Sequence, residues 1–170
     1  MQIHSKNLLK LAVFVGAMFL TVAVVYAQDW LRADHKISGG RVRSNQRHAQ
    51  EEALELLHLS QINRPVQKEE FIDFYNTIKR DLTASDKSLA KLEGESRKVK
   101  EASDLVASIK KHHAKVIEQC DQAEKKAEAD KEFVGKSSTE IYFELEAAQA
   151  DTQKLLAVLK VESLEPPKKK

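Results

Sequence analysis

The 170-residue sequence contains one cysteine, three prolines and five glycines, and only 6% of its residues are aromatic. A single cysteine excludes an intramolecular disulfide framework and a multi-cysteine zinc site. So few turn-forming residues argue against a sandwich, a barrel or a doubly wound sheet. Charge is nearly balanced, with 28 lysines and arginines against 26 aspartates and glutamates. The composition therefore predicts an all-α protein, and because its cations are interleaved with carboxylates, no nucleic-acid partner is expected.

One long hydrophobic run lies near the N-terminus. Residues 11–27 carry no charge, and with Leu8 and Leu9 they make about 20 residues, or about 30 Å of helix, which is enough to span a bilayer. Tyr26 and Trp30 follow where aromatic side chains favour the membrane interface. We therefore expect residues 1–27 to form a hydrophobic helix that anchors the chain in a membrane through residues 8–27.

The same run also fits a secretory signal peptide. Val25 and Ala27 would occupy the small-residue positions before cleavage ahead of Gln28, and the mature protein would then be secreted or periplasmic. This alternative stays open at the level of sequence.

The charges that flank the run give conflicting evidence on topology. Two lysines precede it and five cations follow it, a bias that favours a cytoplasmic body. The cations that follow are Arg32, Lys36, Arg41, Arg43 and Arg47. The rule is weaker for one span followed by a long domain, so we expect a single-pass protein with its body on the exported side. These cations would either contact anionic headgroups or belong to a basic flexible linker at 28–48, and we favour the linker.

Apolar residues at helical spacing begin at residue 49 and continue to the polar, basic tail at 163–170. They predict a body at 49–162 with helices at 49–62, 65–82, 86–134 and 138–161. Thr83 with Asp86 and Ser137 with Glu140 have capping-box spacing, and Gly135 is typical of a helix end. Short connections make sequential helices antiparallel, so we expect an elongated antiparallel helical bundle or coiled coil with 86–134 as its longest helix.

The last two predicted helices carry apolar residues spaced alternately by three and four positions, which is heptad-like. This stripe contains few large side chains and buries little area, so it should depend on partner helices in this chain or another. The predicted interaction seam consists of Val99, Ala102, Val106, Ile109, His113, Val116, Cys120, Ala123, Ala127, Ile141, Leu145, Ala148, Leu155 and Leu159.

Glu55 with His58, His113 and Cys120 could bind a metal, respond to pH or form a disulfide. Glu55 and His58 have the E-x-x-H spacing of di-iron bundles, but those sites need a second such pair and further carboxylates, so no metal is expected. His113 would either make the packing pH-sensitive or act as a polar residue that sets register, which we favour. Cys120 would form an intermolecular disulfide in a parallel dimer or act as a small buried hydrophobe, which we favour.

No catalytic motif is present in the sequence. The Val134–Ser137 segment lacks the first glycine and the preceding strand of a P-loop, and no Gly-x-Ser-x-Gly occurs. We therefore expect no enzymatic activity, no cofactor and no small-molecule substrate. The sequence favours a membrane-anchored tether or assembly subunit that acts through helix–helix contacts with a protein partner or another copy. The alternative is an exported helical binding or chaperone-like protein.

Overall fold

The computed structural model describes residues 3–62, 67–126 and 131–161, with side chains in these ranges from residue 31 onward. The described residues form four α-helices and no strand. They are α1 (Ile3–Gln61), α2 (Lys68–Ser96), α3 (Lys100–Lys126) and α4 (Lys131–Val158). The all-α class and the packing of helices against each other are therefore confirmed. The side chains of the anchor at 1–27, Ala127 and the tail at 163–170 lie outside the described residues.

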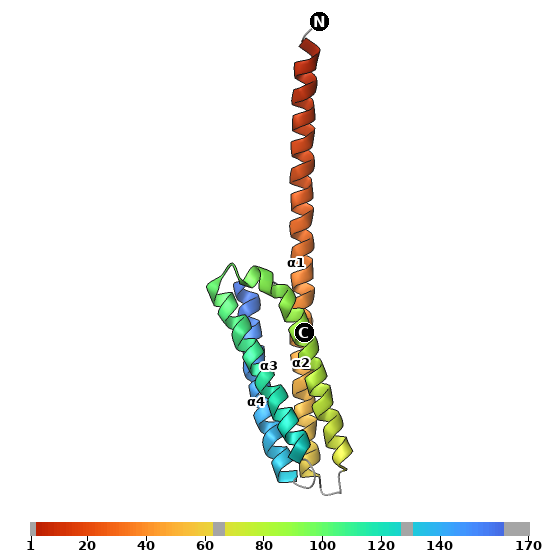
Figure 1. Ribbon diagram of the computed structural model, residues 1–170, viewed down its shortest axis with the longest axis vertical. Coiled ribbons are helices and arrows are strands. Elements are labelled where there is room, and N and C mark those ends of the chain that lie inside the picture. The colour runs from red at the N-terminus through yellow and green to blue at the C-terminus, as the bar shows by residue number, and fades with distance from the viewer. Residues whose placement is uncertain (1–2, 63–66, 127–130, 162–170) are drawn as a thin grey trace, which may run out of the picture. The chain divides into compact units, whose positions relative to one another are not determined.

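The chain divides into two compact units, residues 1–35 and residues 36–170. The first unit contains the earlier part of α1. In the second unit the later part of α1 lies side by side with α2, α3 and α4 (Figure 1), and we call these four helices the bundle. Among residues with described side chains, no helix has an apolar stretch that is long enough to cross a membrane.

Sequential helices of the bundle run antiparallel. Ser108, early on α3, donates a hydrogen bond to Asp151, late on α4. Gln119, late on α3, lies 3.4 Å from Glu140, early on α4. The start of α3 therefore lies beside the end of α4, and the end of α3 beside the start of α4. This is the antiparallel arrangement that short connections require.

Residues 28–48, where we predicted a flexible linker, are helical instead. The side chains of Val42 and Gln46 in this segment are fully buried. A Cβ on Gly39 would lie 2.5 Å from Leu156 Cδ2, so this glycine allows α1 to approach α4 closely. The missing side chain of Gly39 therefore serves helix packing rather than flexibility.

The predicted turn at 83–85 is also helical, because α2 continues to Ser96. Thr83 Oγ1 donates to the Lys79 carbonyl oxygen at 2.8 Å, one turn earlier in the same helix. A hydroxyl that bonds back along its own helix does not cap a new one. The break comes instead between Ser96 and Lys100, so the predicted long helix at 86–134 is divided between α2 and α3.

The predicted helix stop at Gly135 lies inside α4, which begins at Lys131. Ser138 Oγ donates to the Val134 carbonyl oxygen at 2.7 Å, and Thr139 Oγ1 donates to the Gly135 carbonyl oxygen at 2.8 Å. A Cβ on Gly135 would lie 2.8 Å from Ser60 Oγ on α1. This second glycine therefore also lies at a close helix–helix approach rather than at a cap.

Two apolar clusters form the core of the bundle, and every helix contributes to both. The larger cluster lies toward the end at which α3 ends and α4 begins, and Leu56, Tyr75 and Ile141 are among its buried members. The smaller lies toward the α2–α3 turn, around Val42, Leu89 and Ile109. The sequence between the two clusters is mostly polar on each helix, and buried polar side chains meet there.

Candidate functional site: a buried polar layer

A layer of polar side chains separates the two apolar clusters. Gln46 on α1, Ser85 on α2, His113 on α3 and Thr152 on α4 all have no exposed surface. Asp86, next to Ser85, reaches the layer from a position where 37% of its side chain is exposed. Each of the four helices therefore contributes at least one polar residue at the same level of the bundle.

Hydrogen bonds connect this layer across the core. Gln46 Nε2 lies 2.9 Å from His113 Nε2 and donates to Thr152 Oγ1 at 2.9 Å. His113 Nδ1 lies 2.7 Å from Asp86 Oδ1. An amide nitrogen can only donate, so His113 Nε2 accepts from Gln46 and the imidazole proton sits on Nδ1, from which it is donated to Asp86. One imidazole thus connects three helices, and Gln46 extends the connection to the fourth.

Two atoms of the layer have no hydrogen-bond partner among the described residues. They are Gln46 Oε1 and Ser85 Oγ, and both are buried. Buried polar atoms without a partner cost stability. Apolar side chains at these positions would avoid this loss of stability, so the polar layer is not the most stable packing here. Buried polar residues with this property are best known for fixing the register of helix bundles.

Sequence reasoning found part of this layer. His113 was singled out as a polar seam residue, and Thr152 has the same three-and-four spacing between the seam residues Ala148 and Leu155. Gln46 was missed because its segment was assigned to a linker, and Asp86 because it was assigned to a helix cap. The pattern Val42, Gln46, Ala49, Ala53 and Leu56, spaced by three and four, would have placed Gln46 on the core face of a helix.

An ion-pair cluster lies beside the layer, between α3 and α4. His112 Nδ1 lies 2.6 Å from Glu144 Oε1, and Lys115 Nζ donates to Glu144 Oε2 at 2.5 Å. Burial on its own would raise the pKa of Glu144, but the hydrogen bonds from Lys115 and His112 outweigh it and lower the pKa. Asp151 behaves in the same way, because the hydrogen bonds from Ser108 and Lys154 outweigh burial.

A second histidine pair joins α1 to α2. His48 Nδ1 contacts Asp81 Oδ2, and His48 Nε2 lies 3.4 Å from Glu52 on its own helix. The hydrogen bond to Asp81 is the main cause that raises the pKa of His48. About half of the His48 side chain is exposed, so solvent screens this pair and its contribution to stability is small.

The seam residues are mostly buried within the bundle. Two lie elsewhere: Val99 is in the α2–α3 turn with 40% of its surface exposed, and Leu159 is partly buried beyond the end of α4. Ala127 lies outside the described residues. The seam members that are fully or almost fully buried are Ala102, Val106, Ile109, His113, Val116, Cys120, Ala123, Ile141, Leu145, Ala148 and Leu155. The helices of this chain thus pack on the stripe that we predicted would need partner helices.

Cys120 is a free thiol with no exposed surface. Burial is the largest cause that raises its pKa, to about 12. The thiolate is the reactive form, so this side chain acts as a small core residue while the bundle is folded.

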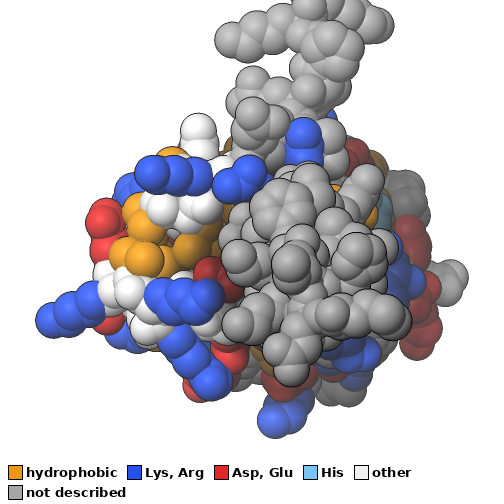
Figure 2. Space-filling model, turned by 90° about the horizontal axis from the view of Figure 1, so that it is seen from above, with side chains coloured by type: hydrophobic (Ala, Val, Ile, Leu, Met, Phe, Trp, Pro, Cys, Tyr) orange, Lys and Arg blue, Asp and Glu red, His pale blue; other side chains and the backbone are white. Residues whose placement is uncertain are grey.

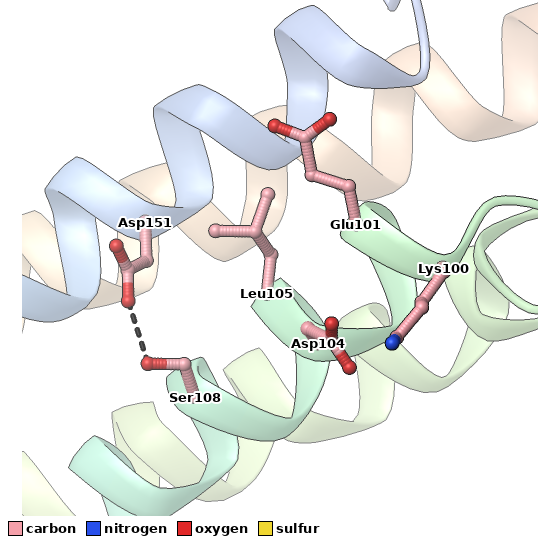
Figure 3. Close-up of a pocket in the computed structure, with 6 residues that line it drawn as sticks. All are labelled: Lys100, Glu101, Asp104, Leu105, Ser108 and Asp151. Carbon is pink, nitrogen blue, oxygen red and sulfur yellow. Dashed lines mark hydrogen bonds between the residues drawn. The ribbon is translucent and has the colours of Figure 1, made fainter.

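A shallow hollow of about 590 Å³ lies on the surface between α3 and α4 (Figure 3). Leu105 and Glu101 reach toward α4 in this view, whereas Asp104 and Lys100 point away from it. Ser108 and Asp151 close one side through a 2.7 Å hydrogen bond. Glu101 and Asp104 point in different directions, so these carboxylates do not converge on one point of the hollow.

Metal-ligating residues do not gather in the described part of the chain, where no group of three or more His, Cys, Asp or Glu side chains is placed to hold an ion. Glu55 and His58, the E-x-x-H pair, are both exposed on α1. No protein-family model, no curated protein and no solved structure matches this chain.

Proposed function

We propose that the protein is a single-pass membrane-anchored helical bundle that acts as a tether or assembly subunit through its helix faces. The observation that carries this proposal is the charge-free run of residues 11–27, which immediately precedes a chain that folds as a bundle. A run of this length is long enough to cross the hydrocarbon core of a bilayer. The body would lie on the exported side, and the proposal assigns it no catalytic reaction.

The outer surface of α4 supports the assembly part of the proposal. The side chain of Phe143 is 60% exposed, and its ring packs edge-on against Tyr142 with 5.7 Å between ring centroids. Exposed aromatic side chains held in one orientation are typical anchors of protein interfaces. Because the seam is occupied inside the bundle, a partner helix would have to use such an outer face.

Alkaline extraction of the full chain from membranes tests the anchor. We expect the wild-type chain to remain in the pellet, because a spanning helix is released only by detergent. The variant Phe14→Asp with Phe19→Asp should be extracted, since each buried charge costs about 2.5–3.5 kcal/mol at the centre of a spanning helix. Phe143→Asp, the same substitution on α4, is the matched control and should stay in the pellet. Release of the wild-type chain by alkali would contradict the anchor.

The intact mass of the native protein distinguishes the anchor from the alternative, an exported helical binding or chaperone-like protein. Val25 and Ala27 are the residues that favour this alternative. A mass that corresponds to a chain beginning at Gln28 would establish cleavage and overturn the anchor. In that case Ala27→Arg should restore the full-length mass, because a charged side chain does not fit the small-residue position.

Photo-crosslinking in native membranes tests the assembly role. A photoreactive phenylalanine analogue at Phe143 should give adducts of defined mass, and an adduct of twice the chain mass would identify a second copy. The same analogue at Gln153, which is also exposed on α4, is the control. Equal adduct patterns at both positions, or none at Phe143, would contradict a role for this face.

A further inference from the structure

The turn between α2 and α3 is basic and carries one exposed apolar side chain. Arg97, Lys98, Val99 and Lys100 follow one another and are all exposed, with Val99 showing 40% of its surface. Backbone hydrogen bonds hold the turn, from Arg97 N to Glu93 O at 3.0 Å and from Val99 N to Ser96 O at 3.1 Å. The four side chains therefore project from a fixed backbone.

The C-terminal end of α4 lies at the same end of the bundle as this turn (Figure 1). Lys160 has φ 52° there, and Val161 N bonds to Leu156 O at 2.9 Å, which closes the helix end. Seen from above, hydrophobic side chains on the described part of this face lie between lysine and arginine side chains (Figure 2). We call Arg97, Lys98, Val99, Lys100 and Lys160 the basic end.

Three of the four cations of the basic end lie near the carboxylates of Glu93, Glu95 and Glu101 in the sequence. Lys98 pairs with Glu95 at 2.8 Å, and Arg97 lies 3.9 Å from Glu93 with 79% of its side chain exposed. Lys100 and Lys160 have no ion pair with any residue that the structure describes. Exposed pairs of this kind are weak and exchange readily with other anions. The basic end is thus available to a surface that carries many negative charges.

Only a few residues of the sequence separate the hydrophobic run from the bundle. α1 enters the bundle at residue 36, and Gly39 on α1 lies against Leu156 near the end of α4. The run ends at Ala27, nine residues before residue 36. Even a fully extended chain of this length spans only about 30 Å. A tether this short gives the basic end a high effective concentration at any membrane that holds the run.

We propose that the basic end docks on the anionic headgroups of the bilayer in which residues 8–27 are anchored, with Val99 inserted among the headgroups and the cations around it paired with lipid phosphates. This inference rests on the proposed membrane anchor. A small apolar area between cations suits an interfacial lipid contact, whereas a protein interface has a broader apolar centre from which lysine is depleted. A docked basic end would hold the bundle against the membrane, so that Phe143 is presented in a defined orientation.

An environment-sensitive fluorophore on Val99→Cys in the full chain tests the proposal. The buried Cys120 should not react with the label, and the labelled wild-type chain checks this. The chain is reconstituted in phosphatidylcholine vesicles with and without phosphatidylglycerol. We expect a blue-shifted emission only with the anionic lipid, reversed by high salt. A label at Lys111→Cys, an exposed position on α3 remote from this end, should keep a water-like emission in both vesicles.

Charge variants show whether the headgroup charge is responsible. Each cation removed from a membrane surface lowers binding about fivefold, so Lys98→Gln with Lys100→Gln should lower the ratio of docked to undocked chains about 25-fold. The matched control, Lys111→Gln with Lys125→Gln, removes the same charge elsewhere and should change the ratio less than about twofold.

Flotation and alkaline extraction of the same vesicles distinguish the two proposals. A chain that does not stay with the vesicles overturns the anchor, whatever the fluorophore shows. An anchored chain with a water-like emission at position 99 in anionic vesicles overturns the docking while the anchor stands. A blue shift that is equal in neutral vesicles, or that depends on the number of chains per vesicle, also overturns the docking, because it would report another contact.

Discussion

Replacing the two central members of the polar layer tests how the bundle balances hydrogen bonding against burial. Gln46→Leu leaves His113 Nε2 without its donor at the centre of the core, and His113→Leu leaves a Gln46 amide hydrogen without its acceptor. The variant with both changes leaves neither group. Leucine is close in volume to both residues, so little space is lost or gained.

The expected energies follow from these contacts. A buried donor or acceptor that loses its partner costs about 1–3 kcal/mol, so each single variant should be less stable by about 2 kcal/mol. The double variant removes both groups together with the unpaired Gln46 Oε1, and it should lie within about 1 kcal/mol of the wild type or exceed it. Thr152 can then bond to a carbonyl of its own helix. The coupling energy should therefore be about 3 kcal/mol.

Urea unfolding of the full chain in a mild detergent, monitored by circular dichroism, measures the free energy of unfolding of each variant. His113→Leu combined with Val99→Ala is the control. Val99 is exposed in the α2–α3 turn, about 20 Å along the helix direction from His113, so the two changes should be additive. If the destabilisations of Gln46→Leu and His113→Leu simply sum in the double variant, the hydrogen bond across the core does not connect these residues and our description of the layer is wrong.

Three further predictions follow from the contacts described above. Gly94→Ala, at a helix position where a Cβ would have no neighbour within 4 Å, should stabilise the bundle by about 0.5–1 kcal/mol in urea unfolding. The Cβ of Gly39→Ala would meet Leu156, so this variant should have a free energy of unfolding at least about 1 kcal/mol lower than that of Gly94→Ala. Equal effects would contradict the close approach of α1 to α4. Cys120, with its pKa raised to about 12 by burial, should react with a thiol reagent at mildly alkaline pH only after unfolding, and rapid reaction of the folded chain would show that it is accessible. Hydrogen bonds from Lys115 and His112 outweigh burial and lower the pKa of Glu144 in the folded state, so its contribution to stability is present at neutral pH and is lost as the pH falls through the folded pKa. Glu144→Gln should therefore destabilise the bundle by about 1 kcal/mol at neutral pH and by much less under acidic conditions, and a difference that does not change with pH would contradict the assignment.

Sequence patterns were most informative about which residues face the core. The three-and-four spacing from Ala102 to Ala123 and from Ile141 to Leu155 describes positions that are buried in the structure. Periodicity succeeds here because a helix has only one face toward the core, so apolar residues that recur at its period must lie on that face.

Helix ends were harder to predict from the sequence, because residue types that are common at helix ends also occur inside helices for other reasons. Thr83 and Ser138 have the hydroxyl groups of helix caps, yet both bond to carbonyls within their own helices. Gly39 and Gly135 have the flexibility expected at linkers and helix ends, yet both lie where α1 and α4 approach closely. The neighbouring helix, which the local sequence does not contain, decides between these uses.

The sequence by itself determined that the chain is helical, that it carries one apolar run near the N-terminus, and which residues form the stripe of α3 and α4. These properties are local, because they depend on spacing and composition within a few turns of helix. Only the tertiary structure decided where the helices end, that the stripe is covered within the chain, and that Gln46 meets His113 and Thr152. Such contacts join residues far apart in the sequence, and the free energy of packing all four helices together selects them.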